Sequence, residues 1–282
     1  MSAAVNSAAC AHDGQVTDYS NPPQVRTAKC RADVVPHPSH ESAGNCFSEI
    51  STAIPRWKRA FDLLFVILTL PVTLPLMGLV ALWVKLVSRG PALFRQQRIG
   101  LNGRPFVIQK FRSMRPDAPR GVHQRHFRNL VRTNSPMVKL DLLCDNRLIP
   151  GGCLLRASGL DELPQIFNVL RGEMSLVGPR PCLPGELRYF TGAQRERFQA
   201  LPGLTGIWQV EGKGLSTFTE MNAMDVCYVR RASVRVDLGL ILRTPGALLK
   251  QVGDAAGQRL RNRAPAARAA EPVSDAGFPG IG

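Results

Sequence analysis

The chain has 282 residues, a hydrophobic content of 44% and a formal net charge of +15, a length that holds one or two domains with a sizeable core. The positive excess lies in residues 56–250, which implies polyanionic partners such as nucleic acid, anionic lipid headgroups or phosphorylated substrates. Seven scattered cysteines have no C-x-x-C spacing, which argues against a disulfide framework and against a cysteine metal site.

Both ends of the chain are predicted to be disordered tails. Residues 1–55 and 251–282 are rich in small residues, polar residues and proline, and they have almost no apolar periodicity. The first 50 residues have no apolar segment of the kind found in a signal peptide. We therefore expect the ordered domain over residues 56–250.

An apolar run opens this domain. Residues 63–84 carry no charge and are long enough to cross a bilayer, but Pro71 and Pro75 interrupt them. Basic residues flank the run on both sides, and positive charge favours the cytoplasmic side of a membrane. The run, about residues 60–87, is predicted to be a re-entrant helix–break–helix segment, followed by a cytoplasmic catalytic domain.

The rest of the domain is predicted to be mainly helical, in an α+β fold with a small β element. Short β segments at 93–94 and 106–111 flank a turn at 100–103. Helices are expected over 161–170, over 185–201 as a basic amphipathic helix at the membrane interface, and over 218–229. The apolar stretch 236–249 is too short to span a membrane.

The adjacent acids Asp161 and Glu162 are the main candidates for chemistry. Their simplest interpretation is structural, because Ser158-x-x-Asp161 resembles a capping box. Pro164 places a helix start close to Asp161, since proline is tolerated in the first turn. A carboxylate there could instead be a nucleophile towards phosphorus, and Glu162 could hold a divalent cation.

Several basic residues could complete a phosphate site. Lys110 and Arg112 end a predicted strand, Arg156 lies five residues before Asp161, and Arg180 stands between two prolines that stiffen the backbone. Arginine suits bidentate phosphate contacts, whereas lysine acts as a point charge. Each of these residues alone could be a solvated surface cation, but together with the acidic pair they predict phosphate chemistry.

Six motifs occur in the order typical of one family. They are KRAFD at 58–62, FRQQRIG at 94–100, KFRSM at 110–114, LDELPQ at 160–165, NVLRGEMSLVGPRP at 168–181 and PGLTGIWQV at 202–210. On these motifs the chain resembles the polyprenyl-phosphate glycosyl-1-phosphate transferase family of bacterial sugar transferases, in its single-membrane-domain, exopolysaccharide-type form. The resemblance covers about residues 56–250.

The resemblance implies a reaction at the bacterial inner membrane. A UDP-sugar gives its sugar 1-phosphate to polyprenyl (undecaprenyl) phosphate and releases UMP, in a Mg²⁺-assisted route through a phosphoryl-aspartate. This is the first membrane step of exopolysaccharide, capsule or O-antigen assembly. By this resemblance Asp161 is the nucleophile and Glu162 is the Mg²⁺ ligand. Four basic residues are implied to bind phosphate, namely Lys110, Arg112, Arg156 and Arg180. Gln209 and Trp208 are implied to contact the nucleotide sugar, and Asp225 and Tyr228 also match the family pattern.

The sequence departs from the family pattern at a few positions. Leu74 precedes Pro75 where serine is common, so Thr69 or Thr73 is expected to satisfy the carbonyl groups freed by the prolines. Gly159 stands where serine or threonine is common, and Asn146, Pro150 and Cys153 replace a proline and two basic residues.

Two other classes of function stay open on the residues alone. One is a membrane-tethered basic binding protein, and the other is a non-catalytic membrane-bound subunit of a polysaccharide assembly complex. For the favoured transferase we expect a polyprenyl phosphate lipid, a UDP-sugar and the membrane as partners, and no nucleic acid. A homodimer stays open, and the sequence does not identify the sugar.

Overall fold

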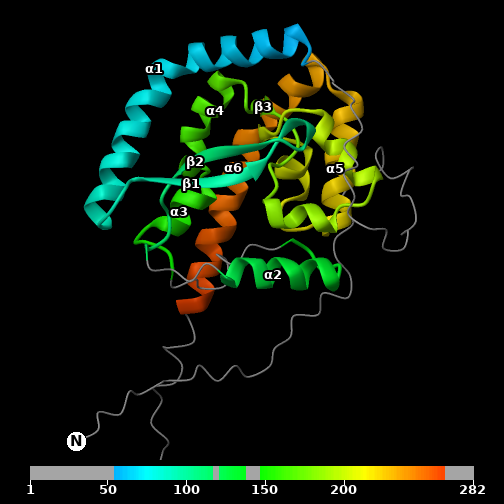
Figure 1. Ribbon diagram of the computed structural model, residues 1–282. Coiled ribbons are helices and arrows are strands. Elements are labelled where there is room, and N and C mark those ends of the chain that lie inside the picture. Colours follow the sequence, from blue (N-terminus) through cyan, green and yellow to red (C-terminus); the bar gives the residue numbers. More distant parts are fainter. Residues whose placement is uncertain (1–53, 117–120, 138–146, 264–282) are drawn as a thin grey trace, which may run out of the picture.

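The computed structural model describes residues 54–116, 121–137 and 147–263, and the tail predicted over residues 1–55 falls almost wholly outside them. Helices dominate, with two small two-stranded sheets, so the mainly helical α+β fold is confirmed. Figure 1 shows the helices α4 and α6 behind the strand pair β1–β2, with α1 curving around one side of the domain.

Helix α1, Arg56–Val87, contains the apolar run and both of its prolines. The chain stays helical through Pro71 and Pro75, and Figure 1 shows a bent helix rather than two separate ones. A bend is the usual effect of proline inside a helix, because the ring clashes with the preceding turn. The predicted interruption is therefore a kink.

The exposure of α1 is that of a membrane helix. Among the described residues it is the one helix long and apolar enough to cross a bilayer, and only 17% of its most apolar window is buried. Leu64, Leu68, Val72, Leu79 and Leu86 are 66–76% exposed. A helix in a soluble core would bury such side chains, so α1 associates the chain with a membrane.

The expectation for the threonines of α1 is wrong. The Thr69 hydroxyl donates to the carbonyl oxygens of Phe65 and Val66, at 2.9 and 3.1 Å. The carbonyls freed by proline lie four residues before each ring, at Ile67 and Pro71. The Thr73 hydroxyl is buried and has no hydrogen-bond partner among the described residues.

Strands β1, Leu93–Ile99, and β2, Pro105–Phe111, form an antiparallel hairpin. The β segments predicted at 93–94 and 106–111 lie within these strands, but β1 is longer than predicted. The turn η2, Leu101–Gly103, places Asn102 in the left-handed region with φ 52°. Because side chains alternate across a strand, Arg98 and Lys110 lie on the same face of the hairpin.

The acidic pair lies at the start of a helix, but without the predicted cap. After α3, Gly152–Ala157, a short 3₁₀ helix η4, Leu160–Gln165, leads into α4, Ile166–Arg171. The capping-box interpretation is wrong, because the Ser158 hydroxyl donates to the Leu155 carbonyl at 3.1 Å. Gly159, with φ 74°, caps η4 instead and turns Ser158 away from it.

The predicted amphipathic helix over 185–201 is also absent. Two 3₁₀ helices, η5 Pro184–Tyr189 and η6 Ala193–Gln199, replace it, and Phe190 between them has an extended backbone. Arg197, expected on a membrane-facing basic surface, is only 1% exposed. The segment packs into the domain because its aromatic side chains form a second core with Phe127, Trp208 and Phe218.

Several of the remaining elements were not predicted from the sequence. Strands β3, Ser175–Val177, and β4, Gly203–Thr205, pair in parallel, and a π-helix, η7, spans Trp208–Gly212. Helix α5, Phe218–Arg231, is confirmed and begins with a capping box between Thr217 and Glu220. Helix α2 spans Gly121–Arg132. Helix α6, Val234–Arg263, contains the apolar stretch 236–249 and continues past the boundary predicted at residue 250.

Buried polar contacts fix the beginning of α1 to the domain. The Lys58 ammonium lies 2.5 Å from the Asp237 carboxylate and donates to the Val177 carbonyl at 2.8 Å. The Asp62 carboxylate accepts from the Ser175 hydroxyl and the Leu176 amide, at 3.0 and 3.1 Å. The membrane helix is thereby attached to β3, which leads directly into the Gly-Pro-Arg-Pro segment.

Candidate active site

A cavity of about 550 Å³ opens between α1, the hairpin, η4 and α6, and it collects most of the predicted site residues. Its wall is strongly basic. The charged residues that line it are Arg98, Lys110, Arg147, Arg156, Arg180 and Lys213, against the carboxylates Asp161 and Glu162. Apolar side chains from α4 and α6 and two threonines of α1 complete the lining. Such a site favours ligands that carry several negative charges.

Both members of the acidic pair line this cavity. Asp161 is 6% exposed, whereas the Glu162 side chain is 38% exposed. Lys110, near the end of β2, places its ammonium 2.6 Å from a Glu162 carboxylate oxygen. The hairpin and η4 therefore bring a cation and two carboxylates together, although the sequence separates them by about fifty residues.

Arg156 and Arg180 reach the same cavity, but Arg112 does not belong to its lining. The Arg112 guanidinium donates to the carbonyl oxygens of Ser88 and Arg89, at 2.8 and 2.6 Å. These contacts close the C-terminal end of α1 against the hairpin. The structure thus brings together five of the six predicted charged residues and directs Arg112 to a structural contact.

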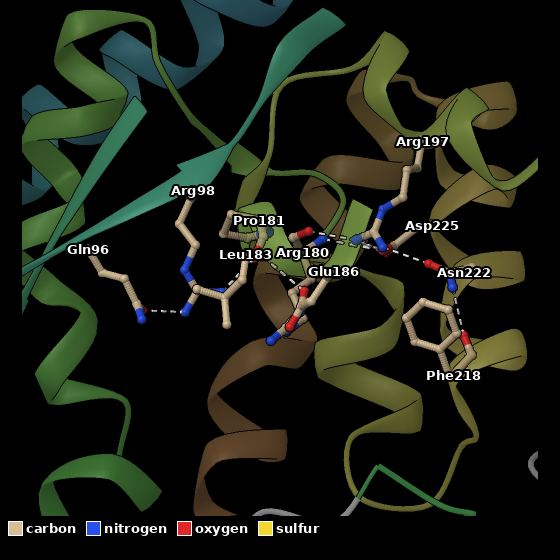
Figure 2. A network of polar contacts seen from close by, with 10 residues as sticks. All are labelled: Gln96, Arg98, Arg180, Pro181, Leu183, Glu186, Arg197, Phe218, Asn222 and Asp225. Atoms are coloured by element: carbon tan, nitrogen blue, oxygen red, sulfur yellow. Dashed lines mark hydrogen bonds and ion pairs between the residues drawn. The ribbon is translucent and has the colours of Figure 1, made fainter. Parts of the chain in front are cut away.

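Arg180 is held in place from several directions (Figure 2). Its guanidinium lies 3.1 Å from the buried Glu186 carboxylate and 5.9 Å from the centre of the Trp208 ring. The Arg180 carbonyl accepts from Arg197 at 2.6 Å, and Arg197 in turn pairs with Asp225 at 2.6 Å. This network orients a cation before any ligand arrives.

The network shifts the pKa values of its members. Burial alone would raise the pKa of Glu186, but the guanidinium groups of Arg180 and Arg98 outweigh it and hold the value below the ordinary range. Burial raises the pKa of Asp225 to about 6, against the opposing charge of Arg197. Both carboxylates are therefore ionised at neutral pH.

Gln209 lines the cavity next to Trp208. The indole nitrogen of Trp208 donates to the Ser216 hydroxyl at 2.8 Å, which fixes the ring. The Gln209 side-chain oxygen is enclosed and has no hydrogen-bond partner among the described residues. Buried polar atoms are normally paired, so this oxygen is available as an acceptor for a bound ligand.

Asp225 and Tyr228 match the family pattern but do not line the cavity. Asp225 supports Arg180 through Arg197, as above, and the Tyr228 hydroxyl bonds to the Asp237 carboxylate at 2.8 Å and the Val177 carbonyl at 2.9 Å. Burial raises the pKa of Tyr228 above its ordinary value, and the Asp237 charge raises it further. Both residues therefore act indirectly, by holding residues and backbone next to the cavity in place.

Sequence reasoning missed three cations of the cavity, Arg98, Arg147 and Lys213. The position of Arg98 in the cavity could have been predicted from the alternation of side chains along the hairpin, because Arg98 and Lys110 lie on the same face. Arg147 and Lys213 stand outside the selected motifs, and no local signal marks them.

The acidic pair is also the place where a metal ion could bind. No group of three His, Cys, Asp or Glu side chains suited to a metal occurs among the described residues. Mg²⁺ does not need one, since it is commonly bound by one or two carboxylates together with substrate phosphates. Asp161 and Glu162, facing a basic cavity, fit that donor set.

A membrane helix, a carboxylate pair and a basic cavity define a membrane-associated protein that handles phosphorylated ligands. The sequence matches the bacterial sugar transferase family over residues 54–251, and the chain belongs to this family. The resemblance drawn from the six motifs is thereby confirmed.

Several relatives are similar over most of this domain. The exopolysaccharide production protein ExoY of Sinorhizobium fredii is 37% identical over 187 residues, covering 66% of this chain and 83% of that protein. The UDP-glucose:undecaprenyl-phosphate glucose-1-phosphate transferase of Caulobacter vibrioides is 41% identical over 205 residues, covering 70% of this chain and 71% of that protein. The undecaprenyl-phosphate galactose phosphotransferase of Salmonella typhimurium is 35% identical over 203 residues, which cover 70% of this chain but 41% of that protein.

Proposed function

We propose that this protein transfers a sugar 1-phosphate from a UDP-sugar to polyprenyl phosphate and releases UMP. The names of the Caulobacter and Salmonella relatives, which act on undecaprenyl phosphate, support this reaction. One structural observation supports it best. The acidic pair, the basic residues and Thr69 and Thr73 of the membrane helix all line one cavity, where a soluble nucleotide and a lipid phosphate can meet.

In the first step, the Asp161 carboxylate attacks the sugar-bearing phosphorus of the UDP-sugar. A bond forms between the carboxylate oxygen and phosphorus, and the phosphorus–oxygen bond to UMP breaks. UMP leaves with the electron pair, and the sugar phosphate stays on Asp161 as an acyl phosphate. In the second step, an oxygen of polyprenyl phosphate attacks the same phosphorus, which restores the Asp161 carboxylate.

The surrounding cations make this attack feasible. A carboxylate approaching a diphosphate meets like charge, and the basic lining of the cavity offsets that repulsion. Lys110 stands beside Glu162 at the reacting end, and Arg180 is oriented in advance by Glu186. Glu162, with Asp161 beside it, would hold Mg²⁺, which supplies positive charge to the transferred phosphate when bound.

We further propose that α1 is re-entrant, and that the catalytic domain faces the cytoplasm at the inner membrane. Two contacts support this path. The domain binds the start of α1 through Lys58 and Asp237, and it binds the end of α1 through Arg112 and the Ser88 carbonyl. A straight helix of 32 residues would separate its ends by about 48 Å, so a domain on one side of the membrane could not easily hold both.

The alternative is a non-catalytic membrane subunit of a polysaccharide assembly complex, and one variant separates the two. UMP release from UDP-glucose or UDP-galactose is measured with purified protein in nanodiscs containing undecaprenyl phosphate and Mg²⁺. We expect Asp161→Asn to abolish release and Glu162→Gln to reduce it strongly. Asp254→Asn, at an exposed carboxylate on α6, is the matched control and should behave like the wild type.

Unchanged turnover in Asp161→Asn would remove the assigned nucleophile. Absence of UMP release from the wild type with every UDP-sugar would favour the assembly subunit. In the transferase, the reaction is the first membrane step of exopolysaccharide, capsule or O-antigen assembly, because it loads the first sugar onto the lipid carrier.

A further inference from the structure

Arg98 is the most informative of the cations that motif-based reasoning missed. It lies near the end of β1, on the hairpin face that also carries Ile108 and Lys110, and all three residues line the cavity. Arg98 is paired with Phe106, four residues along β2 from Lys110. At the rise of a strand this separates the backbone positions of the two residues by about 13 Å along the hairpin. Lys110 is at the end next to α1, and Arg98 is at the other end.

Within the described part of the chain, Arg98 forms no ion pair with a carboxylate. Its two terminal nitrogens donate to neutral acceptors, the Pro181 carbonyl at 3.0 Å and the Gln96 side chain at 2.7 Å. Its Nε is enclosed and has no hydrogen-bond partner among the described residues. Figure 2 shows this guanidinium beside Arg180 and Glu186.

The nearby carboxylates form their hydrogen bonds and ion pairs with other groups, although the second Glu186 oxygen, Oε1, has no hydrogen-bond partner among the described residues. Glu186 accepts from the Arg180 side chain at 3.1 Å and from the Leu183 amide at 3.0 Å. Asp225 pairs with Arg197 at 2.6 Å. Three guanidinium groups therefore share two buried carboxylates, which leaves excess positive charge at the cavity wall. Burial and the neighbouring Arg180 lower the pKa of Arg98 to about 10, the direction expected for an uncompensated cation.

We propose that Arg98 and Arg180 together bind the phosphate of the UMP half of the UDP-sugar. This inference rests on the proposed function and adds two cations, one of them from the hairpin end away from Lys110, that bind the phosphate adjoining the reacting one. The Arg180 guanidinium faces the Trp208 ring, and Gln209, the next residue in sequence, also lines the cavity, with a side-chain oxygen that has no hydrogen-bond partner among the described residues. The cavity wall here can therefore also hold a nucleoside. Two guanidinium groups suit a phosphate because each can donate two hydrogen bonds.

The test compares two ligands that differ only by the phosphate. Affinities for UMP and for uridine are measured by calorimetry with the full chain in nanodiscs. We expect Arg98→Gln to weaken UMP binding about tenfold, the size of a lost charge-assisted hydrogen bond, and to leave uridine binding unchanged. Arg98→Lys keeps the charge and should recover part of the loss. Arg95→Gln, on the opposite, exposed face of β1, is the matched control and should change neither affinity.

A purely structural role for Arg98 predicts a different result. Loss of the Pro181 contact would then weaken UMP and uridine equally, and that outcome overturns the proposal. Unchanged UMP affinity together with a raised KM for undecaprenyl phosphate would assign the guanidinium to the lipid and overturn it as well. Wild-type protein that binds neither UMP nor uridine would instead remove the nucleotide site and with it the proposed function.

A measurement on the wild type covers the case in which Arg98→Gln does not fold. Phenylglyoxal modifies arginine, and modified peptides are quantified by mass spectrometry. We expect UMP to protect Arg98 several-fold while uridine does not, and we expect Arg95 to react equally in both. Equal modification of Arg98 with and without UMP would overturn the proposal.

Discussion

Arg197 is the buried centre of the network behind the site, and its removal gives the sharpest test of that network. The guanidinium is 1% exposed, pairs with Asp225 at 2.6 Å, and donates to Asn222 and the Arg180 carbonyl, each at 2.6 Å. Arg197→Met keeps much of the volume but leaves the Asp225 carboxylate buried without its cation. Breaking a buried ion pair in this way costs about 3–5 kcal/mol.

The cost can be measured as a change in melting temperature. For a domain of this size, 1 kcal/mol shifts the melting temperature by about 2–4 °C, so Arg197→Met should melt roughly 6–20 °C below the wild type. The shift should be smaller at pH 5 than at pH 7, because protonation of Asp225 removes the unpaired charge. Release of UMP should also fall, since Arg180 loses the contact that holds its backbone.

Arg230→Met is the matched control, because it breaks an ion pair between the same two elements, α5 and η6. Arg230 lies 2.7 Å from Glu196, but its side chain is 54% exposed. Such surface pairs contribute about 0–1 kcal/mol, so this variant should melt within about 4 °C of the wild type. Equal small shifts in both variants would refute the assignment of Arg197 as the centre of a buried network.

Three further predictions concern the same framework. Burial raises the pKa of Asp225 from 3.8 to about 6, so the folded protein holds this proton more tightly than the unfolded chain does. The stabilisation of the folded state by the protonated Asp225 is therefore full below pH 3.8 and is lost as the pH rises through 6. In Asp225→Asn, the difference in unfolding free energy between pH 5 and pH 7, measured by denaturant titration, should be smaller by roughly 1 kcal/mol. Arg112→Met should lower the melting temperature, because its guanidinium bonds to the carbonyl groups of Ser88 and Arg89 just after α1. The KM for the UDP-sugar, measured from UMP release, should stay within about twofold, because Arg112 does not line the cavity; a large rise in KM would place Arg112 in the phosphate site. Lys58→Met should leave Asp237 buried without its cation and cost about 3–5 kcal/mol in thermal unfolding, and a loss below 1 kcal/mol would contradict the attachment of α1 through this pair.

Local patterns in the sequence were sufficient to locate the strands of the hairpin, α5 and the acidic pair. The turn at 100–103 between two β segments defines the hairpin, and Thr217 and Glu220 mark the start of α5. Asp161 and Glu162 could be selected because they are adjacent and precede Pro164. In each case the signal lies within a few residues, where propensity and capping act.

Contacts between distant segments could not be predicted in this way. Lys110 and Arg112 are two residues apart, yet one faces Glu162 and the other faces the end of α1. Arg197 was expected on a basic surface, but Asp225, which buries it, comes from another helix. Charge alone does not distinguish these roles, because the partner that decides whether a cation is buried is not near it in the sequence.

The predicted capping box at Ser158 does not form, and the reason lies in the local backbone. Its spacing to Asp161 matches a capping box, but Gly159 takes a left-handed conformation and begins a 3₁₀ helix rather than an α-helix. Because no capping box forms, capping does not explain why a carboxylate stands at position 161. Its position on the cavity wall is instead consistent with the proposed role in phosphoryl transfer.

The proposed mechanism requires Asp161 to carry the sugar phosphate, and trapping this covalent intermediate tests it directly. Protein in nanodiscs without polyprenyl phosphate is mixed with the UDP-sugar and Mg²⁺, quenched, and digested for mass spectrometry. If Asp161 is the nucleophile, we expect one equivalent of UMP and a sugar-phosphate adduct on the peptide that contains Asp161, and we expect the adduct to disappear when the lipid is added. UMP release only in the presence of lipid, with no adduct at any time, would contradict this mechanism.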